Sequence, residues 1–364
     1  MNTENTAKKL VVLGSANVDI SAWTPRFPKD GESVVGNTVR IGMGGKGTNQ
    51  ATAAARCGAR VVMLARLGCD FFASIPEQHY KEEGIDARFV TKDTEAGTGC
   101  ALIEVHAETG ENRITVVPGA NHKIPDEVLY AAEDEIASAD LLLTQMETNP
   151  SSIALFLALA KKHNKPVVLN PAPAMPIPED WYPMIDTITP NETEACTYTG
   201  VDVTDDDAAK KAADIFHEKG VRRVVITCGS RGVFLADYTG EKPMYITVPT
   251  NRVRAVDTTG AGDAFNGAFC VALAEGRTII DACRFACCAA TISVTRPGAA
   301  PSMASREEAD EVYNAYYHSG KKIDARARML AAANHLFWRA IEGTGEDGLV
   351  TEQDVRNCLK QKEE

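Results

Sequence analysis

Short apolar runs alternate with longer amphipathic stretches from about residue 10 to residue 294, and this alternation limits the possible folds more than any other feature. The apolar runs are rich in Val, Ile and Leu and cover residues 10–13, 60–64, 140–144, 166–169 and 223–227. Such runs are typical of strands buried on both faces of a parallel sheet. The stretches 49–56, 151–163 and 206–219 have helical character. We therefore predict an α/β fold, with a doubly wound, mainly parallel sheet flanked by helices.

Two segments interrupt this alternation. Residues 21–44 and 97–121 are polar and rich in Thr and Gly, and parts of them, such as 100–106 and 113–117, alternate with period two. We interpret them as strands of a small sheet that projects from the main one. Because ligands of open α/β sheets bind beyond the carboxyl ends of the strands, a small sheet growing from those ends would act as a lid.

The charge balance and the cysteines narrow the class of protein. Lys and Arg number 38 against 50 Asp and Glu, which gives a net charge of -12 and argues against DNA or RNA as the main partner. No apolar run reaches the roughly 20 residues of a membrane helix, and the first residues lack the pattern of a signal peptide. The 10 cysteines show no metal-ligand spacing. We expect a protein of a reducing, cytoplasmic compartment without a membrane partner.

The strongest motif is Asp-Thr-Thr-Gly-Ala-Gly-Asp at residues 257–263, which runs directly into a helical pattern. Glycines at a helix N-terminus let backbone N–H groups converge on an anion. Asp263 would lie on the first turn, where the helix dipole keeps a carboxylate ionised. This arrangement suits phosphoryl transfer, with amides that stabilise the transferred group and an Asp that takes the proton of the acceptor. An Asp that merely caps a helix is the alternative for the short Gly-Ala-Gly-Asp piece alone.

A second glycine-rich motif, Gly-Met-Gly-Gly-Lys-Gly-Thr-Asn-Gln at residues 42–50, also enters a helix. It contains GxGxxG but does not follow the first strand, as a dinucleotide fingerprint would. It is not a P-loop either, because Gly47 follows Lys46 where Ser or Thr would hold magnesium. Lys46 and Asn49 at the mouth of a helix suit a polyhydroxyl ligand. A tight turn with a solvated lysine is the alternative for this segment alone.

Polar residues also follow several predicted strands, at the edge where ligands bind in such sheets. Asn17 and Asp19 follow the first strand, and Glu147 follows the strand at 140–144. Asn191 and Glu194 come after a short run at 187–189, and residues 227–232 follow the last strand. Each of these could be an ordinary polar loop residue, but together they would form the rim of an active site.

Residues 44–68 and 257–269 resemble the two signature regions of the PfkB (ribokinase-like) carbohydrate kinase family. The resemblance runs from about residue 10 to 310, and the pieces at 44–50, 170–174, 189–194 and 229–232 are most similar to those of the ribokinases. It implies ATP-dependent phosphorylation of D-ribose at O5 by a kinase domain over residues 1–317. It also implies a homodimer that forms through the lid sheet.

The family's functional positions are carried over residue by residue. The implied catalytic residues are Asp263 as general base and an anion hole of Gly260, Ala261 and Gly262. The implied sugar ligands are Asn17, Asp19, Gly45, Lys46, Gly47, Thr48, Asn49, Glu147 and Asp263. The implied ATP contacts are Asn191, Thr227, Cys228, Gly229, Ser230, Arg231, Gly232, Gly262, Asp263 and Cys287. Mg²⁺ would bind Asn191 and Glu194, through water. An activating K⁺ would bind Asp257, Thr259, Ser293, Arg296, Gly298 and Ser302, largely through backbone carbonyls.

Two features depart from this pattern. Cys287 stands where His or Asn often lines the adenine pocket of the family. Residues 318–364 lie outside the resemblance, and we predict a helical extension there with a helix at 325–341. Residues 343–354 have the frame of a Ca²⁺-binding helix–loop–helix, but Gly343 takes the first ligand position and Asp354 the last, so we favour a degenerate loop that packs two helices.

Two alternatives to a ribose kinase stay open at this point. The first is a kinase for another small sugar or a nucleoside, such as deoxyribose or fructose, because the core motifs are common to the family. The second is a non-catalytic ligand sensor of the same fold, with the extension as its interaction module.

Overall fold

The computed structural model of the chain describes residues 7–251, 253–317, 322–334, 336, 338 and 341–360. Its centre is a nine-stranded sheet with the order β13-β12-β11-β10-β9-β8-β1-β4-β5. The strands are β1 (Lys9–Leu13), β4 (Arg60–Gly68), β5 (Asp86–Asp93), β8 (Leu141–Gln145), β9 (Val167–Asn170), β10 (Thr187–Ile188), β11 (Arg223–Thr227), β12 (Val233–Asp237) and β13 (Met244–Val248). All neighbours pair in parallel except β11–β12 and β12–β13, which are antiparallel. The predicted doubly wound, mainly parallel sheet is confirmed.

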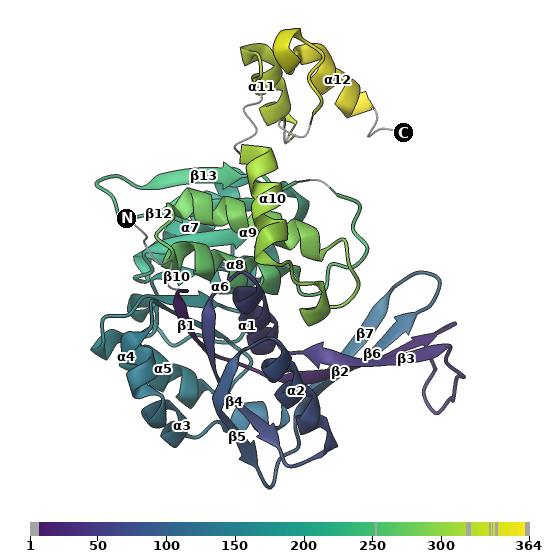
Figure 1. The fold of residues 1–364 in the computed structure, drawn as a ribbon, viewed down its shortest axis with the longest axis vertical. Coiled ribbons are helices and arrows are strands. Elements are labelled where there is room, and N and C mark those ends of the chain that lie inside the picture. Colours follow the sequence, from purple (N-terminus) through teal and green to yellow (C-terminus); the bar gives the residue numbers. More distant parts are fainter. Residues whose placement is uncertain are drawn as a thin grey trace.

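Helices cover both faces of this sheet (Figure 1). They are α1 (Lys46–Arg56), α2 (Ser74–Glu82), α3 (Asp126–Ala131), α4 (Glu133–Ser138), α5 (Pro150–Lys162), α6 (Glu192–Thr199), α7 (Asp206–Glu218), α8 (Ala261–Ala274), α9 (Ile279–Ser293), α10 (Arg306–Tyr317), α11 (Ala325–Ala333) and α12 (Glu352–Lys360). Alternate residues of β1 enter different cores. Leu10 and Val12 pack with α1, α8 and α9, whereas Val11 and Leu13 pack with α3, α5 and α7. Burial on both faces explains why the strands appear in the sequence as continuous apolar runs.

A second, four-stranded sheet projects from one end of the main sheet, as predicted (Figure 1). Its order is β3-β2-β6-β7, with β2 (Asn17–Thr24), β3 (Thr38–Gly44), β6 (Gly99–His106) and β7 (Asn112–Val117). The central strands β2 and β6 pair in parallel, and the outer pairs are antiparallel. β2 begins shortly after the end of β1, so the small sheet starts at the carboxyl edge of the main one, where ligands of such folds bind.

Beyond α10 the chain forms a small cluster of its own, which lies past α10 in Figure 1. Helix α11 ends at Ala333, before the end predicted at residue 341, and part of the predicted helix falls outside the described residues. Ala327, Ala331, Val350 and Val355 form a core separate from those of the main sheet. In the loop with the helix–loop–helix frame, the Asp354 carboxylate accepts hydrogen bonds from Thr344 and Thr351 and so stabilises the loop from within. No described helix is both long and apolar enough to cross a membrane.

The contact between α1 and α8 depends on one glycine, and its replacement should be costly. A Cβ at Gly267 would lie 2.5 Å from the Cβ of Ala53 and 2.6 Å from the backbone oxygen of Gln50. We expect Gly267→Ala to lower the free energy of unfolding by about 1–3 kcal/mol, because the helices must separate. Urea denaturation measures this. Gly42→Ala is the control, since a Cβ there meets no atom within 4 Å; equal stabilities of the two variants would contradict the prediction.

Candidate active site

Helix α8 begins in the glycine-rich motif, and its first turn carries Asp263. Gly260 takes the left-handed conformation (φ +75°), and a Cβ there would lie 3.0 Å from the Cβ of Ala299, so glycine fits this turn best. The N–H of Ala261 donates to the carbonyl of Thr258. The N–H groups of Gly260, Gly262 and Asp263 have no acceptor among the residues that the structure describes. These amides, rather than that of Ala261, are free to bind an anion at the helix N-terminus.

Both oxygens of the Asp263 carboxylate are held by amides of α1. Asn49 donates from Nδ2 to Oδ2 at 2.9 Å, and Gln50 donates from Nε2 to Oδ1 at 2.9 Å. Asp263 is only 5% exposed, so these two donors replace most of the water that would otherwise solvate it. The pair α1 and α8 therefore presents a buried, oriented carboxylate beside free backbone amides.

Three acidic side chains act on the amino group of one lysine. Burial lowers the pKa of Lys46, but the carboxylates of Asp263, Glu147 and Glu194 more than offset this and raise the pKa above its ordinary value. Lys46 is therefore protonated at neutral pH. Glu147 accepts hydrogen bonds from the backbone N–H of Lys46 and from the hydroxyl of Ser15, which joins β8 to the start of α1. Burial, helped by Glu147 and Asp263, raises the pKa of Asp19 to about 7.

The predicted sugar ligands lie where the small sheet leaves the main one. Asp19 lies on β2 opposite Gly42, and its carboxylate reaches Gly44, where a Cβ would come within 2.1 Å of its Oδ1. It lines a cavity of about 620 Å³ together with Trp23 and Arg40, two residues that no sequence motif indicated. The Oδ1 atom of Asn49 is buried without a donor, so it can accept a hydrogen bond from a ligand hydroxyl.

The other predicted sugar positions serve the framework around these groups. Asn17 accepts a hydrogen bond from Asn121 at 2.7 Å. Gly45 precedes α1 with φ +86°, and a Cβ at Gly47 would lie 2.5 Å from the backbone of Gly14. The hydroxyl of Thr48 bonds to Ser15 and Tyr80 in the core. These positions hold the start of α1 in place, and the hydroxyl of Thr48 already has hydrogen-bond partners within the protein.

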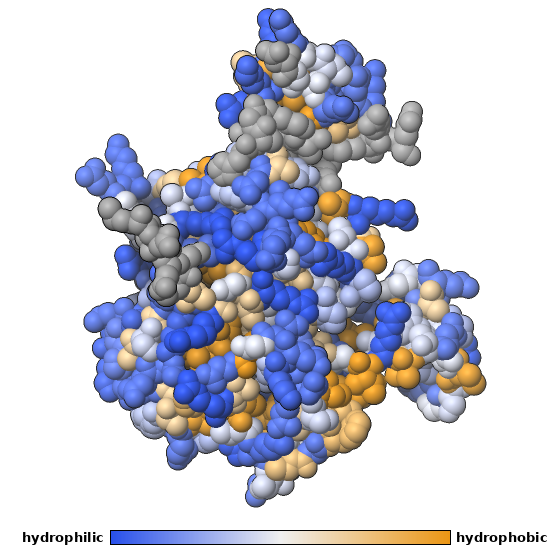
Figure 2. All heavy atoms as spheres, viewed as in Figure 1, coloured by the Kyte–Doolittle hydropathy of each residue, from blue (hydrophilic) through white to orange (hydrophobic). Residues whose placement is uncertain are grey.

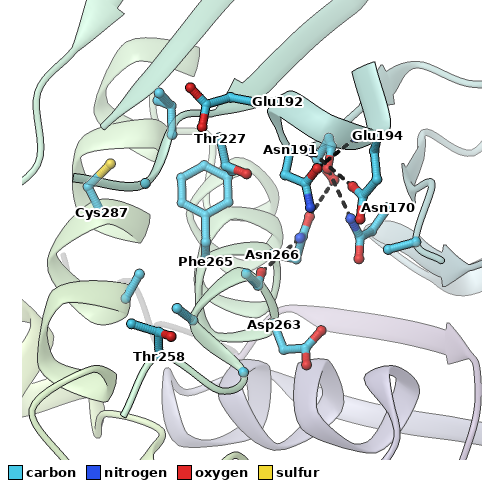
Figure 3. A pocket seen from close by; sticks show the side chains of 18 of the residues that line it. Asn170, Asn191, Glu192, Glu194, Thr227, Thr258, Asp263, Phe265, Asn266 and Cys287 are labelled. Atoms are coloured by element: carbon cyan, nitrogen blue, oxygen red, sulfur yellow. Dashed lines mark hydrogen bonds between the residues drawn. The ribbon is translucent and has the colours of Figure 1, made fainter. Parts of the chain in front are cut away.

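A second cavity, of about 480 Å³, is lined by Asp263. In Figure 3, Asp263 and Cys287 lie at opposite ends of this cavity, with Phe265 between them. Lys46, Asn191, Glu194 and Gly262 also line it. An elongated cavity that carries these polar residues and ends at a helix N-terminus can hold a phosphorylated ligand.

The predicted nucleotide loop after β11 enters this cavity only in part. Thr227, Gly229 and Gly232 line it, and Cys228, Ser230 and Arg231 do not. Cys228 is buried in the core, where its thiol bonds to the carbonyl of Ile226, and Arg231 pairs with Glu192. The tight turn explains this, because Gly229 (φ +52°) and Gly232 (φ +97°) turn the intervening side chains away.

The two predicted magnesium ligands form a capping box at the start of α6. Asn191 Oδ1 accepts from the N–H of Glu194 at 2.7 Å, and Glu194 Oε2 accepts from the N–H of Asn191 at 2.8 Å. The box fixes both side chains at the rim of the cavity and leaves the second carboxylate oxygen of Glu194 to a water or an ion. An arrangement with one remaining acid oxygen fits contact with Mg²⁺ through water.

Three of the predicted potassium positions, Asp257, Thr259 and Gly298, come together between two loops beside α8. Asp257 accepts hydrogen bonds from the N–H groups of Thr259 and Gly298, both at 2.9 Å, and so joins the loops. Ser293 and Ser302 bond to nearby backbone carbonyls, and the guanidinium of Arg296 pairs with Glu308. The side chain of Arg296 is thus engaged elsewhere, and only its backbone is left for a cation. Backbone carbonyl oxygens of these two loops would suit a hard alkali cation.

Several buried polar residues near Asp263 were not selected from the sequence, and of these Asn170, Thr189 and Asn266 line the cavity. Gln50, Gln145, Asn170, Thr189 and Asn266 form a buried hydrogen-bond network beside Asp263, part of which is drawn in Figure 3. Gln145 and Asn170 are the last residues of β8 and β9. The rule that polar residues at the carboxyl ends of strands face the site could have found these two.

Comparisons with known proteins agree with this geometry. The family described as pfkB family carbohydrate kinase matches residues 7–306. The chain is 43% identical to a ribokinase of Haemophilus influenzae over 301 residues, which cover 83% of this chain and 97% of the relative. It is 34% identical to a deoxyribokinase of Salmonella typhi over 303 residues, 83% of this chain and 97% of the relative. The structure of Arabidopsis thaliana ribokinase complexed with ribose and ATP superposes with a TM-score of 0.78 at 33% identity, over 85% of this chain and 99% of that one.

Proposed function

This chain belongs to the pfkB family of carbohydrate kinases and is an ATP-dependent sugar kinase, and we propose that it transfers the γ-phosphoryl group of ATP to the O5 hydroxyl of D-ribose. The observation that carries this proposal is the position of Asp263. Its carboxylate lies at the N-terminus of α8, bound by Asn49 of the sugar-binding motif and exposed to the cavity that Gly262 and Asn191 line. One carboxylate thus adjoins both proposed ligand sites.

The proposed step moves one proton and one phosphoryl group. Asp263 accepts the proton of the O5 hydroxyl while the oxygen forms a bond to the γ-phosphorus. The bond between that phosphorus and the bridging oxygen breaks, and its electron pair leaves with ADP. The free N–H groups of Gly260, Gly262 and Asp263 and the ammonium group of Lys46 stabilise the negative charge of the transferred group. Asp19 and Asn49 accept hydrogen bonds from sugar hydroxyls and orient the acceptor.

Magnesium and potassium complete the proposed site. When bound, Mg²⁺ supplies positive charge against the phosphates, and Asn191 and Glu194 would hold it through water. The loops that Asp257 joins would hold K⁺ with oxygen ligands. Because one of these loops precedes the free amides of Gly260 and Gly262, the cation would order the anion hole.

Release of ADP in a coupled assay tests the substrate. We expect turnover with D-ribose, ATP and Mg²⁺ that increases when K⁺ replaces Na⁺. Turnover that is faster on 2-deoxyribose, fructose or adenosine would keep the mechanism and reject ribose. Absence of turnover on all four, with ribose still bound, would reject the kinase reaction in favour of a ligand sensor.

The affinity for D-ribose should depend on pH through Asp19. Burial, Glu147 and Asp263 raise the pKa of Asp19 to about 7 from an ordinary value of 3.8, so the free protein holds a proton on Asp19 below about pH 7. The free energy of unfolding of the free protein therefore falls as the pH rises from 3.8 to about 7. Sugar hydroxyls donate to the ionised form, so binding releases that proton. We expect the Kd to rise up to about tenfold for each pH unit below 7. Calorimetry measures this, and Asp19→Asn should remove the dependence; a flat profile for the wild type would reject it.

We also propose that the small sheet pairs with its counterpart in a homodimer. Ile41 and Leu102 lie on one face, on either side of Ile20, and are 53% and 46% exposed. Figure 2 shows apolar surface where this sheet leaves the main body. Exposed apolar surface of this kind marks an interface. We expect a dimer in light scattering and a monomer for Ile41→Lys, with His106→Lys, at the far end of β6, as the control. A monomeric wild type would contradict this.

The remaining assignments concern the extension and the compartment. We propose a kinase domain over residues 1–317 and an extension over 318–364 whose own core supports independent packing. The extension contributes no described residue to either cavity, and the hydrogen bonds that Asp354 accepts within its loop support a role in packing. All ten cysteines are free thiols within the described residues, which fits the reducing environment of the cytoplasm.

A further inference from the structure

A row of buried carboxamides connects the ends of two strands to the Asp263 carboxylate. Gln50 and Gln145 are 0% and 1% exposed, and Asn170 is 7% exposed. Gln145 ends β8, Asn170 ends β9, and Gln50 lies on α1 between them. Buried polar groups of this kind are stable when every donor faces an acceptor, so the orientation of each amide matters.

One main-chain carbonyl determines these orientations. Asn170 Nδ2 lies 2.9 Å from the carbonyl oxygen of Thr189, which can only accept a hydrogen bond. The NH₂ group of Asn170 must therefore face Thr189, and its Oδ1 must face Gln50. Gln50 Nε2 lies 3.0 Å from that oxygen and must be the donor. The same Nε2 lies 2.9 Å from Oδ1 of Asp263.

Gln145 fixes Gln50 from the opposite side. Its Nε2 donates to Gln50 Oε1 at 2.7 Å, so a flip of the Gln50 amide would place two NH₂ groups together on one side and two oxygen acceptors against Oε1 on the other. Gly14 leaves room for Gln145, since a Cβ there would lie 2.4 Å from its Oε1. The donor-to-acceptor direction of each hydrogen bond in the row, from Thr189 to Gln145, is thus determined by the backbone carbonyl of Thr189.

We propose that Gln50, oriented by Asn170 and Gln145, is a positioning residue that holds the Asp263 carboxylate in the orientation needed to accept the proton of the substrate. With Asn49 on Oδ2 and Gln50 on Oδ1, each carboxylate oxygen has one fixed donor. Rotation of the carboxylate would break both hydrogen bonds, so its remaining lone pairs keep one direction. The inference rests on the proposed role of Asp263 as the general base.

The charged groups near Asp263 lie outside α8, and the substitutions of Gln50 and Gln145 leave their charges unchanged. They are Asp19 on β2, Lys46 at the start of α1, and Glu194 on α6, each of which interacts electrostatically with Asp263. Glu147 acts on Asp19 and Lys46 in turn. A change in the pH profile of a neutral variant therefore reports on the amide row and not on a lost charge.

The test compares Gln50→Met and Gln145→Met with Thr52→Val, in kcat, in KM for D-ribose and in melting temperature. Methionine keeps the length of glutamine and removes its polarity. Thr52 is a matched control, because it is buried on the same helix and its hydroxyl bonds to Thr48 and His79, away from Asp263. We expect kcat to fall about 10- to 100-fold for Gln50→Met, with KM within about threefold. The acid limb of its kcat profile should move to higher pH, because the ionised carboxylate loses a donor.

Gln145→Met, which does not touch Asp263, should change kcat and the pH profile in the same direction by about 3- to 10-fold. This variant also tests the positioning role if Gln50→Met does not fold. Thr52→Val should leave both unchanged. A lower melting temperature or a higher KM in the glutamine variants, with kcat unchanged, would overturn the positioning role. Wild-type turnover separates the two proposals: its absence overturns the reaction and this inference together, whereas normal wild-type turnover with unchanged glutamine variants overturns this inference only.

Discussion

Asp263→Asn should reduce kcat with D-ribose by about 10²- to 10⁴-fold, the range typical of a lost general base, and change KM for D-ribose only a few-fold. The side chain keeps its size but loses the ability to take a proton. Asn49 and Gln50 both donate to the carboxylate, and an amide offers only one acceptor for these two donors, so part of the loss comes from a disturbed orientation. Steady-state ADP release over a range of ribose concentrations measures both constants.

A carboxylate elsewhere provides the matched control. Asp205 accepts a hydrogen bond from the N–H of Ala208 at 2.8 Å and caps α7, so Asp205→Asn removes a carboxylate at a helix N-terminus outside both cavities. We expect kcat of this variant to equal that of the wild type. If Asp263→Asn instead raised KM and left kcat intact, Asp263 would be a sugar ligand and the base would have to be another residue.

The order of strands and helices could be predicted because the central strands are buried on both faces. A continuous apolar run such as residues 10–13 is visible without knowledge of its neighbours. The strands β12 and β13 were not predicted, since they pair with each other and with β11 at the edge of the sheet, and residues of β13 are half-buried. Helix α11 ends earlier than its apolar pattern suggested. Edge strands and the ends of surface helices depend on contacts that a local pattern does not contain.

The site shows the same division between local and long-range information. The glycine-rich motif at residues 257–263 predicted the N-terminus of α8 and the position of Asp263, because these features follow one another in the chain. Gln50 stands in the other motif, directly after Asn49, yet its function depends on how α1 crosses α8. That crossing depends on Gly267, whose missing side chain lets the backbone of Gln50 approach. Only the structure shows that contact.

Lys46→Met should reduce kcat by about 10²- to 10³-fold, the loss typical when one group that stabilises transition-state charge is removed. The sequence suggested Lys46 as a sugar ligand, but the structure places it on the lining of the elongated cavity with Asn191 and Gly262. Its neighbours Asp263, Glu147 and Glu194 keep the ammonium protonated, so it carries a full positive charge to the place where phosphoryl charge develops. Methionine matches its length without the charge. Lys92→Met is the control, because Lys92 pairs with Glu77 on the surface. A rise in the KM for ribose with kcat unchanged would show instead that Lys46 only binds the sugar.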